Sequence, residues 1–470
     1  MTRPSGAIGG VSDSALAARG LAFGTPLIRP ALFTYTRSLF PFDFWRDATG
    51  RVRTNFTRQA FCPTPDVTPW LAVTTYYVDI NQANDTGDGL SWATAKKSIN
   101  AAITTGNAQA NPYIVYVRAG TYPRGNCPSG SAGTVIANKA CSLIAVGGRV
   151  VTGFFDALTW TLDQGTTYRA TRAGSRRAIR LDTVDQDGLF PDYTWVVDLA
   201  TCRATPGSWY TDNTTTYVNR ADGAAVNDAN TRILLTVGST SPLPMTTSGN
   251  MYVSGFDLSG NTPCILFGNA TGRFVAEDCT FRYSAGDDGI IVGTTGLRNG
   301  VSMGNIEAAA FIRCDASANQ VDGFNSHASS GTQAFVFTMD CTAFNNGRPG
   351  AQSCNAFTTH DGGKWIDLRG IAARNAGGQV AIVQDNTAMW CIDTLCYDSR
   401  GDQIYGGTVP PSDFLVDQGS VGGCKLFLEN CAAATSQYSL NVRYGTIYTR
   451  GGKFPVGRYV GNGGVVTPLS

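Results

Sequence analysis

Charged side chains and histidine are scarce in this chain of 470 residues. Asp, Glu, Lys and Arg make up 15% of it, well below the usual quarter, and the formal net charge is +1. So balanced a charge argues against broad electrostatic binding of nucleic acid. Two histidines and no Cys-x-x-Cys pair argue against a zinc site. We therefore expect neither a metal ion nor a cofactor.

Long apolar runs are also missing. No stretch of about twenty apolar residues occurs, so we expect no membrane insertion. The first residues, MTRPSGAIGGVSDSALAARGLAFG, are interrupted by glycine and match a secretory signal poorly. A secreted enzyme would normally need such a signal, whereas a phage structural protein released by lysis would not.

A short unit repeats through roughly the last two hundred residues. Each copy opens with a β-prone run such as FVAEDC, FVFTMDC or LFLENC and then enters a turn rich in Gly, Asn and Asp. The equivalent positions are Cys279, Cys314, Cys341, Gly370, Cys396, Cys431 and Gly452, separated by 35, 27, 29, 26, 35 and 21 residues. Periods of about 20–50 residues are typical of stacked architectures, in which one coil cannot bury its apolar face alone.

Apolar residues at a fixed distance from these positions predict the interior of the stack. Four residues before them stand Val275, Ala310, Phe337, Ile366, Ile392, Phe427 and Tyr448, and two residues after them Ala is commonest. Since side chains two residues apart share one face of a strand, we expect all three positions to point inward. The thirteen cysteines would then be mostly free, buried thiols rather than a disulfide framework.

The segment TYYVDINQANDTGDGLSWATAKKSINAAI, residues 75–103, has its own order of elements. A strand and a polar turn precede a helix that we expect to start near Ser91, with Ala95, Ile99, Ala102 and Ile103 on one face. The strand YIVYVRAGTY follows. This order resembles the entry of the pectate-lyase-like right-handed parallel β-helix family. The resemblance implies an all-β, right-handed parallel β-helix, or solenoid, whose open end the helix covers.

Two parts of the chain depart from the repeat. Residues 1–72 carry scattered Arg, the aromatic cluster LFTYTRSLFPFDFW and several prolines, and we interpret them as a distinct N-terminal region. Either they attach the protein to a virion or they cap the first coil. Residues 73–470 form the predicted β-helix, and between about 148 and 249 the repeat fades into irregular or inserted strands.

The two histidines occupy matching places in adjacent units. Phe324-x-x-His327 and Phe357-x-x-His360 share one offset, so stacked coils would bring the rings within roughly one strand spacing, ~4.8 Å. The next unit offers Asp385 at the same offset from Ile382. Histidine beside carboxylates can serve as a general acid or base near neutral pH.

Two further carboxylates flank the histidines in sequence. Asp322 lies before the first and Asp361 directly after the second. One interpretation makes the cluster catalytic. The other is structural, because Asn and Asp ladders also stabilise the turns of a β-helix through hydrogen bonds.

A second catalytic candidate is Asp288, in the pair Asp287-Asp288. The pair resembles the double-Asp element of polygalacturonase-type β-helix hydrolases, and glycoside hydrolysis needs two carboxyl groups. The Asn-Thr-Asp, Gly-His-Gly and Arg-Ile-Lys elements of that family are missing from this chain. Asp-Asp-Gly is also an ordinary turn sequence.

Aromatic and basic residues near the histidines are the candidate substrate contacts. Trp365 precedes Ile366, a position expected to face inward, so alternation turns the indole outward as a sugar-stacking platform. Trp390 lies in the next coil, and Lys364 and Arg348 lie nearby in sequence.

The predicted solenoid and N-terminal region resemble phage tailspikes in architecture. We therefore expect a tailspike or tail-fibre-type receptor-binding protein that recognises, and could depolymerise, a bacterial surface polysaccharide. The resemblance implies a homotrimer attached through residues 1–72 to a phage tail or baseplate protein. The alternatives are a free bacterial polysaccharide lyase or glycoside hydrolase, and a structural virion protein without glycan activity.

Overall fold

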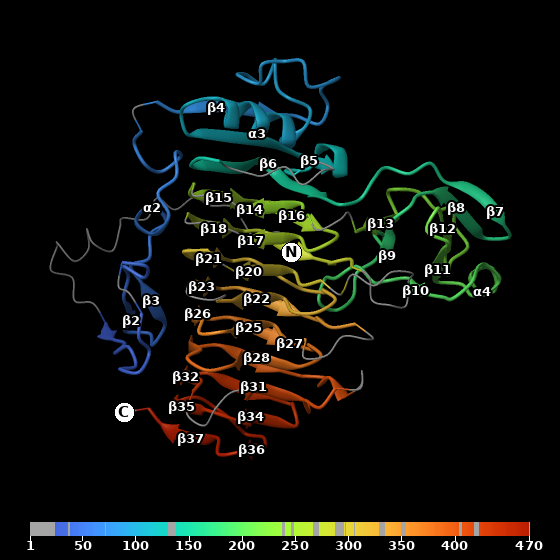
Figure 1. Cartoon of the computed structure of the whole chain (residues 1–470). Coiled ribbons are helices and arrows are strands. Elements are labelled where there is room, and N and C mark those ends of the chain that lie inside the picture. Colours follow the sequence, from blue (N-terminus) through green and yellow to red (C-terminus); the bar gives the residue numbers. More distant parts are fainter. Residues whose placement is uncertain are drawn as a thin grey trace.

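The structure is a computed structural model that describes residues 24–469, apart from 36–37, 71, 130–137, 237–239, 246–248, 267–271, 287–295, 297, 305, 329–333, 349–353, 404–406 and 418–422. These residues form a right-handed parallel β-helix, as the sequence predicts. Figure 1 shows its coils stacked along one axis, with the first coils at the top and the last at the bottom.

Three parallel sheets make up the described part of the solenoid. The long sheet contains β4 (Thr74–Val78), β5 (Tyr113–Tyr122), β6 (Cys141–Gly153), β15 (Met251–Ser254), β16 (Phe256–Ser259), β18 (Arg273–Glu277), β19 (Thr280–Arg282), β21 (Ala308–Ile312), β23 (Phe335–Met339), β26 (Lys364–Leu368), β29 (Ala388–Ile392), β32 (Lys425–Glu429), β35 (Thr446–Arg450) and β37 (Val465–Pro468). The second sheet contains β14 (Leu243–Met245), β17 (Cys264–Leu266), β20 (Val301–Gly304), β22 (Phe324–His327), β25 (Phe357–His360), β28 (Gly378–Val383), β31 (Ser412–Asp417), β34 (Tyr438–Val442) and β36 (Arg458–Val460). The third sheet contains β24 (Thr342–Phe344), β27 (Ile371–Ala373), β30 (Leu395–Tyr397) and β33 (Ala432–Ala434).

One helix covers the open end of the stack. α3 (Ile99–Ala108) buries Ile99, Ala102 and Ile103 against the first coil, as the sequence predicts. The helix is shorter than expected, because Ser98 is its N-cap and accepts a hydrogen bond from the Ala101 backbone N–H. A helix start near Ser91 is therefore wrong. Among the described residues, no helix has the length and apolar character to span a bilayer.

A single backbone conformation marks the corner between the long and third sheets. The corner residues Asp278, Arg313, Asp340, Arg369, Asp393 and Asn430 all have φ between 52° and 58°. Because this residue is in the left-handed conformation, the inward and outward alternation of side chains changes phase between the strand before it and the strand after it. Cys279 consequently points into the core, as expected, whereas Val275 points outward.

The outward row of the long sheet is apolar and buried nonetheless. Val275, Ala310, Phe337, Ile366 and Phe427 belong to a cluster with N-terminal aromatic residues, so their predicted inward position is wrong. The predicted alignment of one coil with its neighbour is also wrong by two residues. Ile366 pairs with Trp390 rather than with Ile392, and Cys396 continues the alanine ladder of the third sheet.

The N-terminal arm, which we define as the described part of residues 24–70, covers this outward row. It contains β1 (Thr25–Pro26), β2 (Phe44–Arg46), β3 (Val52–Thr54) and α2 (Arg58–Phe61). The Phe42 and Phe337 ring centroids lie 4.7 Å apart, and those of Phe44 and Trp390 5.6 Å apart. In Figure 1 the arm lies along the side of the stack, so its described part does not cover the first coil.

Polar contacts fix the arm at both ends of the stack. Arg273 Nη1 donates to the Phe61 carbonyl oxygen at 2.9 Å, and Arg369 Nη1 to that of Val52 at 2.8 Å. Near the last coils, Arg450 Nη2 donates to the Ile28 carbonyl oxygen at 3.1 Å. The arm therefore runs from the last coils back toward the first.

An inserted subdomain separates β6 from β14. It contains β7 (Thr161–Gln164), β8 (Thr167–Thr171), β9 (Ser175–Arg180), β10 (Thr194–Trp195), α4 (Leu199–Ala204), β11 (Ser208–Thr211), β12 (Thr215–Asn219) and β13 (Thr231–Leu235), and the short 3-10 helix η1 (Arg124–Asn126) lies before β6. Its strands pair among themselves. Figure 1 shows it projecting from one side of the solenoid.

Candidate active site

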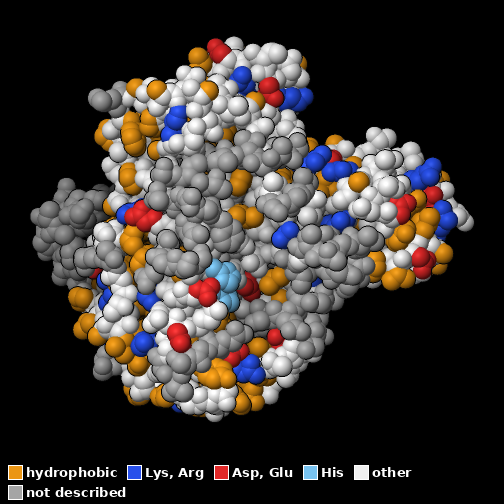
Figure 2. Space-filling view, viewed as in Figure 1, with side chains coloured by type: hydrophobic (Ala, Val, Ile, Leu, Met, Phe, Trp, Pro, Cys, Tyr) orange, Lys and Arg blue, Asp and Glu red, His pale blue; other side chains and the backbone are white. Residues whose placement is uncertain are grey.

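The structure brings the two histidines together. β22 and β25 pair in parallel with His327 opposite His360, because the stacked Phe324 and Phe357 rings in the core fix their register. The imidazole centroids lie 4.3 Å apart and their planes differ by 12°. Figure 2 shows the histidine side chains side by side on the visible face, next to acidic side chains. The predicted stacking of the rings is confirmed.

Asp361 holds one of the two rings. Its Oδ2 lies 3.0 Å from His327 Nδ1. It follows β25 directly and has φ of 55°, which bends the chain at the end of the strand. A carboxylate accepts hydrogen bonds, so Nδ1 carries the hydrogen and Nε2 is left as the proton acceptor. Both side chains remain partly exposed, at 41% for His327 and 36% for Asp361.

The second ring stays uncharged. Burial, reinforced by the nearby His327, lowers the pKa of His360 to about 3. His360 is therefore neutral at physiological pH, and it forms an uncharged stacking surface for the ring of His327. The two histidines thus have different chemical properties although they occupy equivalent positions.

Asp322 lies beneath this surface instead of on it. It is 3% exposed, and burial raises its pKa to about 6. Its carboxyl oxygens accept hydrogen bonds from the Asn355 backbone N–H at 2.6 Å and from Asn325 Nδ2 at 2.5 Å. Asp322 therefore positions Asn325, which shares the outer face of β22 with His327.

Two polar residues beside the histidines were missed by the sequence interpretation. Asn325 and Thr358 pair across β22 and β25, two residues before the histidines and on the same face. Asn325 Oδ1 is buried and has no hydrogen-bond partner among the described residues, whereas the Thr358 hydroxyl interacts with the Asp322 carboxyl group. The motifs Phe-Asn-Ser-His and Phe-Thr-Thr-His could have predicted this, because the second residue of each is two positions before the histidine and so lies on the same face of the strand.

Asp385 and Lys364 do not join the histidine pair. Phe357 pairs with Val380 rather than with Ile382, so the predicted alignment of Asp385 with the histidines is wrong by two residues. Lys364 is 6% exposed and its Nζ donates to the Asn386 carbonyl oxygen. Burial lowers the pKa of Lys364 to about 8.

Neither tryptophan is a sugar-stacking platform. Trp365 is fully buried in the core of the solenoid, where Nε1 donates to Thr338 Oγ1 at 2.9 Å. The predicted outward position was wrong because its reference residue, Ile366, is the one that points outward. Trp390 also points outward but lies beneath the N-terminal arm and is 1% exposed.

The remaining candidates lie elsewhere. Arg348 forms an ion pair with Asp192 of the inserted subdomain, with Nη2 and Oδ2 2.5 Å apart. Asp288 lies outside the described residues. In the described part of the chain, no group of His, Cys, Asp and Glu side chains is arranged to hold a metal ion.

Comparisons with known proteins bear on the fold alone. No protein-family model and no curated protein matches the sequence. Similar solved structures include a glycoside hydrolase, with 10% identity, a TM-score of 0.55 and coverage of 84% of this chain and 96% of that one. A complex of XylC with xylose has 11% identity, a TM-score of 0.51 and coverage of 81% and 69%. Pectate lyase Pel9A has 14% identity, a TM-score of 0.47 and coverage of 83% and 79%.

Proposed function

We propose that this protein binds a polysaccharide on its β-helix and cleaves it at the His327–Asp361 pair. The observation that carries the proposal is the stacked, half-exposed imidazole of His327, whose Nδ1 lies 3.0 Å from Asp361. The glycoside hydrolase and the xylose complex that share the fold are also sugar-related proteins by name, which supports the choice of substrate class.

The residues have separate roles in the proposed reaction. His327 Nε2 accepts a proton from the substrate or from an attacking water, and Asp361 stabilises the imidazolium that forms. His360 stacks on His327 without adding a second positive charge. The unpaired Oδ1 of Asn325 accepts a hydrogen bond from a sugar hydroxyl group.

The test is cleavage of purified capsule and lipopolysaccharide preparations. We expect His327→Ala to lower the rate by about 10²–10⁴-fold, the usual contribution of an acid–base group. Asp385→Ala is the matched control, because Asp385 is an exposed carboxylate in the next coil that is out of register with the histidines. It should cleave like the unmodified protein.

The products distinguish the chemistry. New ultraviolet absorbance from unsaturated uronates indicates elimination, and new reducing ends without it indicate hydrolysis. Equal rates for His327→Ala and the unmodified protein would refute the assigned site. Binding without cleavage would leave a receptor-binding protein that is not an enzyme.

The finer part of the proposal is that the protein acts on a phage tail. The long stacked surface suits a repetitive bacterial surface glycan, and the N-terminal arm offers a route to a tail or baseplate protein. Immunogold labelling of virions tests this location, and sedimentation velocity tests the proposed homotrimer. Labelling of bacterial culture fluid without virions would instead favour a free lyase or hydrolase.

A further inference from the structure

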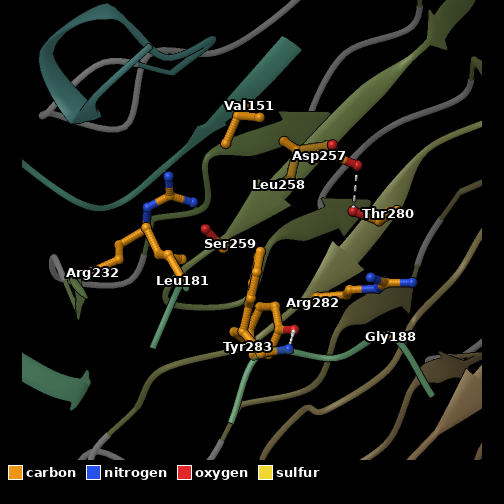
Figure 3. Close-up of a pocket in the computed structure, with 11 residues that line it drawn as sticks. Val151, Leu181, Gly188, Arg232, Asp257, Leu258, Ser259, Thr280, Arg282 and Tyr283 are labelled. Atoms are coloured by element: carbon orange, nitrogen blue, oxygen red, sulfur yellow. Dashed lines mark hydrogen bonds between the residues drawn. The ribbon is translucent and has the colours of Figure 1, made fainter. Parts of the chain in front are cut away.

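A cavity lies between the inserted subdomain and the solenoid. Its volume is about 320 Å³, at the lower end of the range for small-molecule sites. The inserted subdomain contributes Leu181, Phe190 and Arg232, and the solenoid contributes Asp257, Ser259 and Tyr283. Figure 3 shows Arg232 and Leu181 on one side of this space, Asp257 and Leu258 on another, and Ser259 between them.

Arg232 is the unusual residue of this pocket. Its guanidinium carbon lies 4.2 Å from the centroid of the Phe155 ring, and it has no ion pair or side-chain hydrogen bond among the described residues. By contrast, Arg282 in the same wall is paired with Asp315 at 2.5 Å. Burial lowers the pKa of Arg232 to about 10, although Asp228 and Asp257 attract it from a distance. A partly buried cation without a hydrogen-bonded partner is costly, and an anion would relieve that cost.

A hydroxyl group and aromatic rings complete the surface. Ser259 is 6% exposed, and its Oγ is buried without a hydrogen-bond partner in the described part of the chain. The hydroxyl of Tyr283 already accepts a hydrogen bond from the Phe190 backbone N–H at 2.6 Å, and the two rings stack with centroids 6.2 Å apart. The pocket thus combines a cation, a free hydroxyl and an aromatic wall.

The pocket adjoins a larger depression. This depression has a volume of about 730 Å³, and Asp257 and Thr280 line both it and the pocket. Its wall follows the corner between the long and third sheets, where Asp278, Arg313 and Asp340 come from successive coils. A polymer with one residue in the pocket therefore has a polar surface along which its next residues can lie.

We propose that this pocket binds the carboxylate of an acidic sugar residue, with Arg232 as the cation and Ser259 as a hydrogen-bonding partner. The inference rests on the proposed function, because it takes the ligand to be part of the same polysaccharide. The pocket lies at a different corner of the solenoid from the histidine pair, so it is a separate binding site. The uronic acids are the substrate class that it names.

The chemistry favours a carboxylate over other groups. A guanidinium presents two parallel N–H groups that match the two oxygens of a carboxylate. Arg232 supplies one positive charge that no close carboxylate balances, and a uronate carries one negative charge. The apolar face of the sugar ring can lie against Leu181 and Phe190, which line the pocket and are partly exposed.

The experiment compares galacturonate with galactose, which lacks the carboxylate, by titration of the full chain followed with saturation-transfer NMR. We expect galacturonate to bind at least roughly tenfold more tightly, consistent with one charge-assisted hydrogen-bonding pair. Arg232→Met keeps the apolar stem over Phe155 and should abolish that preference. Ser259→Ala should weaken it by a smaller factor, and Arg458→Met, at an exposed arginine of β36, should leave it unchanged.

Several results would overturn the assignment. Equal binding of the two sugars by the unmodified protein would refute the assigned site. A preference for galacturonate that survives both Arg232→Met and Ser259→Ala would refute it as well. Tighter binding of galactose 6-sulfate than of galacturonate would show that the pocket prefers a sulfate group to the proposed carboxylate. His327→Ala separates the two proposals, because it should lose cleavage and keep the galacturonate preference. Cleavage without any galacturonate preference would refute the pocket alone.

Discussion

Phe42→Ala should release the N-terminal arm from the solenoid. Phe42 is 1% exposed, and its ring lies 4.7 Å from Phe337 and 5.1 Å from Phe56, measured between centroids. It also meets the rings of Phe40, Phe44 and Phe61. Removing a ring buried among five others costs about 3–5 kcal/mol, from lost transfer free energy and the cavity left behind.

Native-state hydrogen exchange is the assay for this change, because the arm can open while the coils stay folded. A loss of 3 kcal/mol corresponds to exchange faster by roughly 100-fold at the amides of β2 and β3, since each 1.4 kcal/mol is about tenfold. Leu32→Ala is the control, because Leu32 lies in the same arm and is 51% exposed. Surface substitutions of this kind change stability by about 0.5 kcal/mol or less. Exchange in Phe42→Ala no faster than in Leu32→Ala would refute the packing argument.

Three further predictions concern buried side chains. All thirteen cysteines are free and buried, and burial raises the pKa of Cys314 well above its ordinary value, so a thiol dye should label less than one thiol per native chain and all thirteen after unfolding. Trp365→Ala should cost about 3–5 kcal/mol in denaturant titration, whereas an exposed indole would leave stability unchanged. Burial raises the pKa of Asp413 to about 8 in the folded state, so its folded carboxyl stays protonated above the unfolded pKa. Stability should therefore fall by up to about 1.4 kcal/mol per pH unit between about pH 5 and pH 7 through this group, and Asp413→Asn should remove that part of the slope; identical pH profiles would contradict it.

The repeat predicts the fold class, the free cysteines and the stacked histidines, because each depends on parity and spacing within one coil. The orientation of Trp365 could not be predicted from alternation alone. One left-handed residue, such as Asp340 or Arg369, reverses alternation at every corner, and these residues vary in chemical type. Glycine signals positive φ most plainly, but among the described coils it holds this position at Gly255 and Gly451, while the others have Asp, Arg or Asn there.

The errors at Asp385 and Cys396 have a common form. Each is a displacement of two residues, which keeps a side chain on the expected face but assigns it to the wrong neighbour. The packing of the outward apolar row against the N-terminal arm could not be predicted from the repeat. Residues near Phe42 and near Phe337 are separated by about 300 positions in sequence, and no local pattern indicates that they meet.

The position of the arm sets an order of events in the synthesis of the chain. Ile28 contacts Arg450 across 422 residues of sequence, so the partner of the first arm segment is made almost last. At roughly 5–20 residues per second, about 20–80 s separate the appearance of the two on the ribosome. During that interval the aromatic side chains of the arm have no completed surface to bind. The arm, which is synthesised before the solenoid, is thus among the last segments to reach its final position, and its phenylalanines are the ones most in need of protection from aggregation until then.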